Sequence, residues 1–276
     1  MVRGDEYDLL DAGDGRRLER FGRRVVDRPA ASAFLPPRLP TADWAGADLR
    51  FDRERGWTGA AQDAWTIAID GLTIELRPTA AGQLGFYPEH MHAWSWLRQR
   101  LHEQPGAAVL NLFAHTGATT LALARAGARV THVDASRPAV AWARRNAEVS
   151  SLVEAPIRWI VDDALRFVER EARRGRRYDG LVLDPPSFGH GPHGSRWELE
   201  RALPELLEAC NRIAANHAFV LLTAHSTGLS GDDVRVLLVD AFEPRSRAKT
   251  TVEPLDLVAA SGAVLPLGFA ARMIRR

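Results

Sequence analysis

The chain has 276 residues and a formal net charge of +1, so it can bury a large core, and its charge neither favours nor excludes a nucleic-acid partner. Its only cysteine, Cys210, excludes an internal disulfide and a cysteine-rich metal site, and such cysteine usage is typical of a cytoplasmic protein. No apolar run follows the first residues or is long enough to cross a bilayer, so we expect neither a signal peptide nor a membrane span.

Residues 1–80 contain short strand-like runs separated by turn residues. In two of these runs apolar side chains alternate with polar ones, as in half-buried strands. Asp70-Gly71 between those two runs is a typical two-residue hairpin turn. We therefore predict a small β-rich subdomain over residues 1–80. The strand-like runs are 23–26, 65–69 and 72–76.

From residue 81 to 276, strand-like runs that are apolar on both faces alternate with amphipathic helices. This alternation predicts an α/β fold, a doubly wound and mostly parallel sheet covered by helices on both sides. The runs 252–257 and 267–273 are expected to close the sheet as an antiparallel hairpin edge. The other expected strands are 107–113, 130–133, 157–161, 178–183 and 218–223, and the expected helices are 117–126, 138–149, one ending near 173, 198–214 and 232–239.

Open parallel sheets bind ligands beyond the carboxyl ends of their strands, so the residues just after each strand are the informative ones. Gly117 follows the first strand, where a glycine lets the backbone approach a ligand closely, but the turn is not G-x-G-x-x-G, which disfavours a dinucleotide. Asp134 follows the second strand, and its carboxylate can accept both ribose hydroxyls of a nucleoside-containing cofactor. The alternative is that Asp134 or Ser136 caps the next helix.

The third and fourth strands are also followed by acidic residues. Asp163, in Asp162-Asp163-Ala164, can accept a hydrogen bond from an adenine amino group, with helix capping again as the alternative. The most specific feature is Asp184-Pro-Pro-Ser-Phe188, in which two prolines end the strand and fix the backbone. Asp184 and a backbone carbonyl can then accept hydrogen bonds from one flat amino group, while Phe188 stacks on the base that carries it.

Taken in order, these residues resemble class I S-adenosylmethionine (SAM)-dependent methyltransferases over about residues 82–228. More narrowly, the chain is similar to the bacterial large-subunit rRNA methyltransferases that act on cytosine carbon-5 or guanine nitrogen-7. The resemblance implies SAM as the cofactor, RNA as the substrate partner, and catalytic roles for Asp184, Pro185, Pro186 and Phe188. It assigns cofactor contacts to Phe86, Tyr87, Asn111, Phe113, His115, Thr116, Gly117, Asp134, Ala135, Asp163 and Ala164.

The chain departs from this group at positions that bear on the chemistry. His115 stands where the group usually has tyrosine, and Ser226 stands where the carbon-5 enzymes carry a nucleophilic cysteine. Carbon-5 methylation needs a thiolate, and serine is too weakly acidic to replace it. Cys210 recurs with leucines at helical spacing and is expected in the core. Transfer to a nucleobase nitrogen is therefore favoured, although Ser187 stands where amino-directed enzymes usually have an aromatic.

Other functions remain open on the sequence. The sequence has no recognisable RNA-binding module, so a protein or a small molecule remains an alternative substrate. A non-catalytic SAM-binding or RNA-binding protein is a further alternative, but the intact Asp184-Pro-Pro argues against it. No acid and histidine cluster shows metal-ligand spacing, so no metal is expected. His190 and His193, in a glycine-rich loop, either touch substrate or are solvated, and His225 either lines the acceptor pocket or does not.

Overall fold

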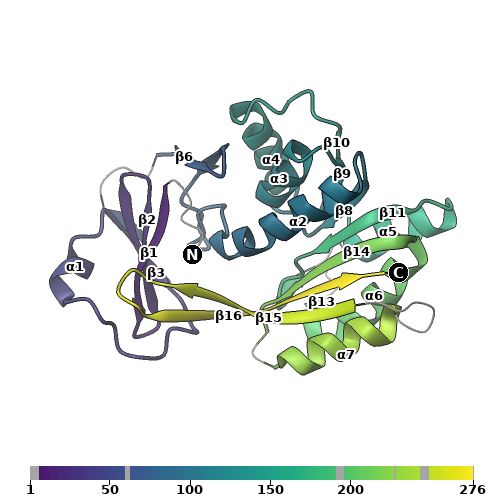
Figure 1. Cartoon of the computed structure of the whole chain (residues 1–276). Helices are drawn as coiled ribbons and strands as arrows, with labels where there is room; N and C mark the ends of the chain where they lie inside the picture. Colours follow the sequence, from purple (N-terminus) through teal and green to yellow (C-terminus); the bar gives the residue numbers. More distant parts are fainter. Residues whose placement is uncertain (1–5, 60–62, 191–195, 227, 243–248, 276) are drawn as a thin grey trace. The chain divides into compact units, whose positions relative to one another are not determined.

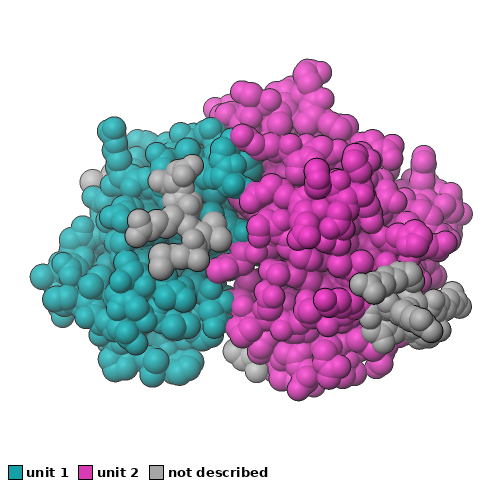
Figure 2. Space-filling view, in the orientation of Figure 1, with its two compact units in different colours: residues 1–91, 256–267 teal, residues 92–255, 268–276 magenta. Residues whose placement is uncertain are grey.

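The computed structural model describes residues 6–59, 63–190, 196–226, 228–242 and 249–275. The chain forms two compact units, drawn in teal and magenta in Figure 2. Unit 1 comprises Met1–Met91 with Asp256–Leu267, and unit 2 comprises His92–Leu255 with Gly268–Arg276. The predicted division between residues 80 and 81 stays a prediction. Within the described ranges, no helix is both long enough and apolar enough to cross a membrane.

The described part of unit 1 is rich in β-structure, as predicted. A five-stranded sheet has the order β1-β2-β3-β4-β5, in which β3 and β4 pair in parallel and the other neighbours are antiparallel. Its strands are β1 (Tyr7–Gly13), β2 (Arg16–Phe21), β3 (Arg24–Pro29), β4 (Leu49–Asp52) and β5 (Gly56–Gly59). The unit also contains the helix α1 (Thr41–Ala45) and the 3-10 turn η1 (Pro88–His90).

The predicted hairpin in unit 1 is confirmed. Strands β6 (Trp65–Ile69) and β7 (Leu72–Leu76) pair antiparallel. Asp70 and Gly71 between them have φ angles of 49° and 72°. Positive φ at both central residues is the geometry of a type I′ turn, which matches the right-handed twist of the strands and favours Asp-Gly.

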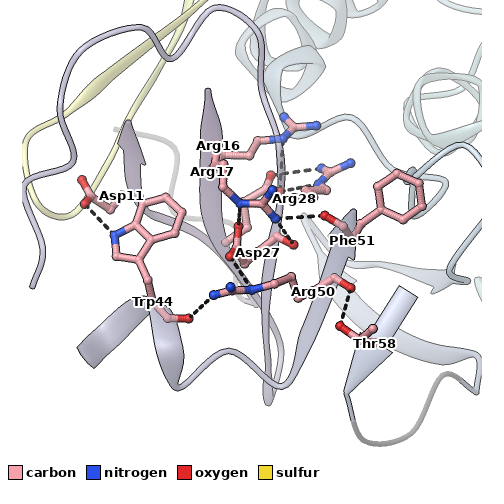
Figure 3. Close-up of polar contacts among 10 residues, drawn as sticks. Asp11, Arg16, Arg17, Asp27, Arg28, Trp44, Arg50, Phe51 and Thr58 are labelled. Atoms are coloured by element: carbon pink, nitrogen blue, oxygen red, sulfur yellow. Dashed lines mark hydrogen bonds and ion pairs between the residues drawn. The ribbon is translucent and has the colours of Figure 1, made fainter. Parts of the chain in front are cut away.

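Two buried ion-pair groups on β2 and β3 were not predicted from the sequence. Glu19 is fully buried, and both of its oxygens accept hydrogen bonds from Arg28, at 2.6 and 3.1 Å. Burial by itself raises the pKa of Glu19, but the charges of Arg17 and Arg28 outweigh it and hold the pKa below its usual value. The buried Asp27 lies between Arg16 and Arg50, at 2.5 and 2.9 Å (Figure 3).

A seven-stranded sheet has the order β10-β9-β8-β11-β14-β16-β15. It belongs to unit 2, except for the end of β15 and the start of β16, which fall within Asp256–Leu267 of unit 1. Neighbours from β10 to β14 are parallel and β16 is antiparallel to β14, which confirms the mostly parallel sheet with an antiparallel edge. The strands are β8 (Ala108–Leu112), β9 (Arg129–Asp134), β10 (Ile157–Val161), β11 (Tyr178–Leu183), β14 (Ala214–Ala224), β15 (Lys249–Val258) and β16 (Val264–Ile274).

Helices cover both faces of this sheet (Figure 1). Helices α3 and α4 contact each other on one face, whereas α6 contacts both α5 and α7 on the other. The chain thus proceeds from β8 outward to β10 and then crosses to β11, so the strand order reverses between β8 and β11. The helices of this unit are α2 (Met91–Glu103), α3 (Ala118–Arg125), α4 (Arg137–Val149), α5 (Ala164–Arg173), α6 (Leu199–Ile213) and α7 (Gly231–Phe242).

Cys210 lies in the core of unit 2, as predicted. It is fully buried on α6, among apolar side chains such as Leu206 and Ile213. Burial raises the pKa of the thiol to about 12, so the sulfur stays protonated at neutral pH.

Candidate functional site

The loop after β8 has an unusual backbone. Phe113 and His115 have φ angles of 55° and 46°, and Gly117, at the amino end of α3, has 85°. Residues other than glycine rarely adopt positive φ, and such strain gathers at ligand sites. A Cβ atom on Gly117 would lie 2.9 Å from the Cβ of Ala143 in α4. Only glycine therefore fits where this loop meets α4. The loop lies at the carboxyl end of β8, one of the two strands between which the strand order reverses.

Asp134, at the end of β9, is fixed by this same loop. Its Oδ2 accepts the backbone N–H of His115 and its Oδ1 accepts that of Ser136, both at 2.8 Å. The helix α4 is capped by Ser136, whose Oγ accepts the N–H of Ala139, so Asp134 is not the helix cap. Each carboxylate oxygen has two acceptor positions. Asp134 is thus an oriented acceptor at the carboxyl end of β9, and its predicted contact with a ribose stays a prediction.

The side chain of Asn111 lies in the interior of unit 2. Its amide donates to Thr120 Oγ1 at 2.9 Å, and Thr120 Oγ1 lies 2.9 Å from Nδ1 of His132. Burial above all, with the nearby charges of His115 and Arg144, lowers the pKa of His132 to about 3, so the ring is neutral. These contacts join β8, α3 and β9 beneath the loop. They give Asn111 a role in holding the loop, while its predicted contact with the cofactor stays a prediction.

The other predicted cofactor residues of unit 2 lie at the same ends of the strands. Thr116 is buried and its carbonyl accepts the side-chain amide of Asn146 at 2.8 Å. Asp163 caps α5 by accepting the N–H of Arg166 at 3.0 Å, so the capping alternative is observed here. Ala135 directly follows β9 and Ala164 begins α5. Their contacts with a cofactor stay predictions.

Asp184 comes directly after β11 and is held by the neighbouring strand. Its Oδ1 accepts a hydrogen bond from the hydroxyl of Thr223 in β14 and lies 3.0 Å from Nε2 of His225. The side chains of Asp184 and His225 are each 24% exposed. The structure therefore brings His225 to the most specific motif of the sequence. Thr223 was not predicted at the site.

The two prolines after Asp184 lead into β12 (Phe188–His190), which pairs antiparallel with β13 (Arg196–Glu198). The carbonyl of Pro186 accepts the indole N–H of Trp197 at 2.6 Å, and the Trp197 ring packs on Phe113 at 5.2 Å between centroids. Sequence reasoning missed Trp197, which links the loops after β8 and β11. Phe188 is 76% exposed, and its predicted stacking on a base stays a prediction.

The remaining predicted residues are placed less fully. Phe86 and Tyr87 belong to unit 1, and their predicted cofactor contacts stay predictions. His193 lies outside the described residues, and His190 is described only as the last residue of β12. Their predicted roles near the substrate stay predictions, as does the expected absence of a metal.

Ser226 stands where a nucleophilic cysteine would be. Its Oγ donates to Oε1 of Glu200 on α6 at 2.7 Å and accepts the N–H of Gly228 at 3.0 Å. The hydroxyl therefore joins the segment after β14 to the start of α6. Since Cys210 is buried and protonated, neither residue supplies a thiolate to the site.

Comparisons with known proteins agree with this fold. A family model described as conserved hypothetical protein 95 matches residues 90–195. The crystal structure of a SAM-dependent methyltransferase from Agrobacterium tumefaciens is similar to this structure, with a TM-score of 0.90 and 35% sequence identity. The match covers 98% of this chain and 90% of the Agrobacterium chain.

Curated relatives match over shorter shares. Ribosomal RNA large subunit methyltransferase K of Neisseria meningitidis serogroup B is 25% identical over 243 residues, which are 84% of this chain and 67% of that protein. Ribosomal RNA large subunit methyltransferase K/L of Pseudoalteromonas atlantica is 31% identical over 180 residues, which are 64% of this chain but only 24% of that protein. The chain thus spans about two thirds of the first relative and about a quarter of the second.

Proposed function

This chain belongs to the SAM-dependent methyltransferases, and we propose that it transfers a methyl group to a nucleobase nitrogen in RNA, with ribosomal RNA as the favoured substrate. The observation that carries the proposal is Asp184, a carboxylate fixed at the end of β11, one strand away from the loop that follows β8. We place this reaction in the cytosol, in keeping with the single cysteine, which is free and buried.

The residues at the ends of β8 and β9 fit SAM. The glycine turn lets the backbone and the amino end of α3 approach a ligand, and Asp134 offers acceptors of the kind that ribose hydroxyls need. When bound, SAM would supply a methyl group from a positively charged sulfur and would leave as S-adenosylhomocysteine, while the amino nitrogen that accepts the methyl group would release one proton to solvent. The role of the protein is then to hold the acceptor in line with that methyl group, because positioning contributes much of the rate of such a displacement.

Asp184 is proposed to orient the acceptor nitrogen. A carboxylate accepts hydrogen bonds and does not donate them, so its partner must bring an N–H, as an exocyclic amino group of a base does. The exposed Phe188 offers a ring on which that base can stack. Transfer to carbon-5 of a pyrimidine is disfavoured, because the one thiol of the chain is buried and protonated.

The choice of RNA rests on the two curated relatives, both named ribosomal RNA large subunit methyltransferases. The test offers SAM with a labelled methyl group to total RNA and to protein extract from cells that lack this gene. The variant Asp184→Ala should lose the label. The control Asp232→Ala alters an 87%-exposed carboxylate on α7 and should keep it.

Label in RNA that only Asp184→Ala abolishes would support the proposal, and nucleoside digestion would then identify the methylated atom. Label confined to protein or small molecules would contradict the RNA substrate. Label in RNA that persists in Asp184→Ala would contradict the role of Asp184.

A further inference from the structure

Two side chains outside the Asp184-Pro-Pro motif meet one oxygen of the Asp184 carboxylate. The hydroxyl of Thr223 donates to Oδ1, and Nε2 of His225 lies 3.0 Å from the same atom. An ionised carboxylate only accepts, so the hydrogen of the second contact belongs to Nε2 of His225. Both contacts come from β14 and the residue after it, the strand that neighbours β11 in the sheet.

The two contacts define how Asp184 is oriented. A carboxylate oxygen has two acceptor positions, and Thr223 and His225 account for both on Oδ1. We therefore expect a hydrogen bond from an acceptor base at the other carboxylate oxygen, Oδ2. Because these contacts restrict rotation of the Asp184 side chain, losing them should leave the direction of Oδ2 less well defined.

The backbone that carries His225 is itself held on two sides. The hydroxyl of Ser187, in the motif after β11, donates to the carbonyl of His225 at 2.9 Å. On β16, a Cβ atom on Gly268 would lie 2.0 Å from the carbonyl oxygen of Ala224 and 3.1 Å from the Cα of His225. The close approach of β16 thus requires glycine at this point. The backbone of His225, directly after β14, is thus held from two sides.

We propose that His225 is a positioning residue for methyl transfer: together with Thr223, it holds the Asp184 carboxylate in the orientation that receives the N–H of the acceptor nitrogen. The proposal rests on the role given to Asp184 in the proposed function. It assigns to His225 neither a contact with the cofactor nor the removal of a proton.

The test compares His225→Leu with His225→Gln, using the full chain. Leucine removes the donor, whereas the side-chain amide of glutamine can place an N–H close to the position of Nε2. His225→Leu should lower kcat about 10- to 100-fold, the effect of losing a charge-assisted hydrogen bond. KM for the RNA and the Kd of S-adenosylhomocysteine (SAH) should stay within about threefold of wild type, and His225→Gln should recover most of kcat.

A second measurement does not depend on activity. Crystal structures of the wild type and of His225→Leu should show one ordered Asp184 rotamer in the former and a displaced or mixed rotamer in the latter. An unchanged Asp184 in His225→Leu would overturn the proposal, as would an unchanged kcat or a kcat that glutamine fails to recover. If the wild type methylates no acceptor, the proposed function fails, while the crystal comparison still decides whether His225 holds Asp184.

Discussion

At the scale of single residues, the site depends on a glycine and two carboxylates that their surroundings hold in place. Gly117 combines a φ of 85° with a close approach to Ala143 in α4. Asp134 is oriented by two backbone amides of the adjoining loops. Asp184 is oriented by side chains of the next strand. In each case the position of the group is determined by the surrounding backbone and side chains as well as by the residue type.

Gly117→Ala should destabilise the protein by about 1–3 kcal/mol, because a methyl group there is both strained in its backbone angle and too close to Ala143. The matched control is Gly127→Ala, whose φ is 92° but whose Cβ would meet nothing within 4 Å. Urea unfolding of the two variants measures the difference. Equal losses of stability would show that the contact with α4 adds nothing to the cost of the backbone angle.

At the scale of elements, polar networks connect the strands and helices that carry the site. Asn111, Thr120 and His132 join β8, α3 and β9 through buried contacts. In unit 1, Glu19 and Arg28 join β2 and β3 in the same way. A buried polar group is stable only when it is paired, so both networks should be sensitive to single substitutions.

His132 should make the protein sensitive to acid. Its pKa is about 3 in the folded chain and 6.5 as an unperturbed side chain. Above pH 6.5 the ring is neutral in both the folded and the unfolded chain, so its ionisation does not affect the free energy of unfolding. As the pH falls from 6.5 toward 3, only the unfolded chain takes up the proton, so stability should fall by about 1.4 kcal/mol per pH unit.

Urea unfolding between pH 7 and pH 4 measures this dependence. His132→Gln should lessen the loss on acidification, whereas the control His217→Gln, at an exposed position of β14, should not. If His132→Gln lost stability with acid as steeply as the wild type, burial of the neutral ring would not be the cause.

Arg28→Met should destabilise the protein by about 3–5 kcal/mol, because it leaves the fully buried Glu19 without its main partner. The control Arg20→Met breaks an exposed pair with Asp8 and should cost about 1 kcal/mol or less. Thermal or urea unfolding of the full chain distinguishes the two. If Arg28→Met lost no more stability than Arg20→Met, the charge of Glu19 would not depend on Arg28 for its compensation.

At the scale of the whole molecule, the strand order of unit 2 explains why distant parts of the sequence form one site. The reversal of order between β8 and β11 brings together residues that follow these two strands, about 70 positions apart in the chain. The next strand, β14, adds Thr223 and His225. The site is therefore a property of the sheet as a whole and not of one motif.

Much of this arrangement was predictable because it follows from local patterns. Apolar runs marked the parallel strands, and Asp70-Gly71 marked the hairpin. Contacts between distant side chains were not predictable in the same way. Nothing in the sequence near Glu19 shows that Arg28 covers it, and nothing near Asp184 shows that His225, 41 positions later, lies 3.0 Å from it. Such contacts depend on which strands become neighbours and on how individual side chains are oriented, which local patterns do not specify.

The central claim is that the cofactor binds at the ends of β8 and β9, whereas Asp184 serves the acceptor. Calorimetric titration of SAH into the wild type, Asp134→Ala and Asp184→Ala tests this most directly. The wild type should bind. Asp134→Ala should lose about 1.5–3 kcal/mol of binding free energy with its ribose contact, and Asp184→Ala should bind like the wild type while failing to turn over. Unchanged binding in Asp134→Ala, or lost binding in Asp184→Ala, would contradict the assignment of the two carboxylates.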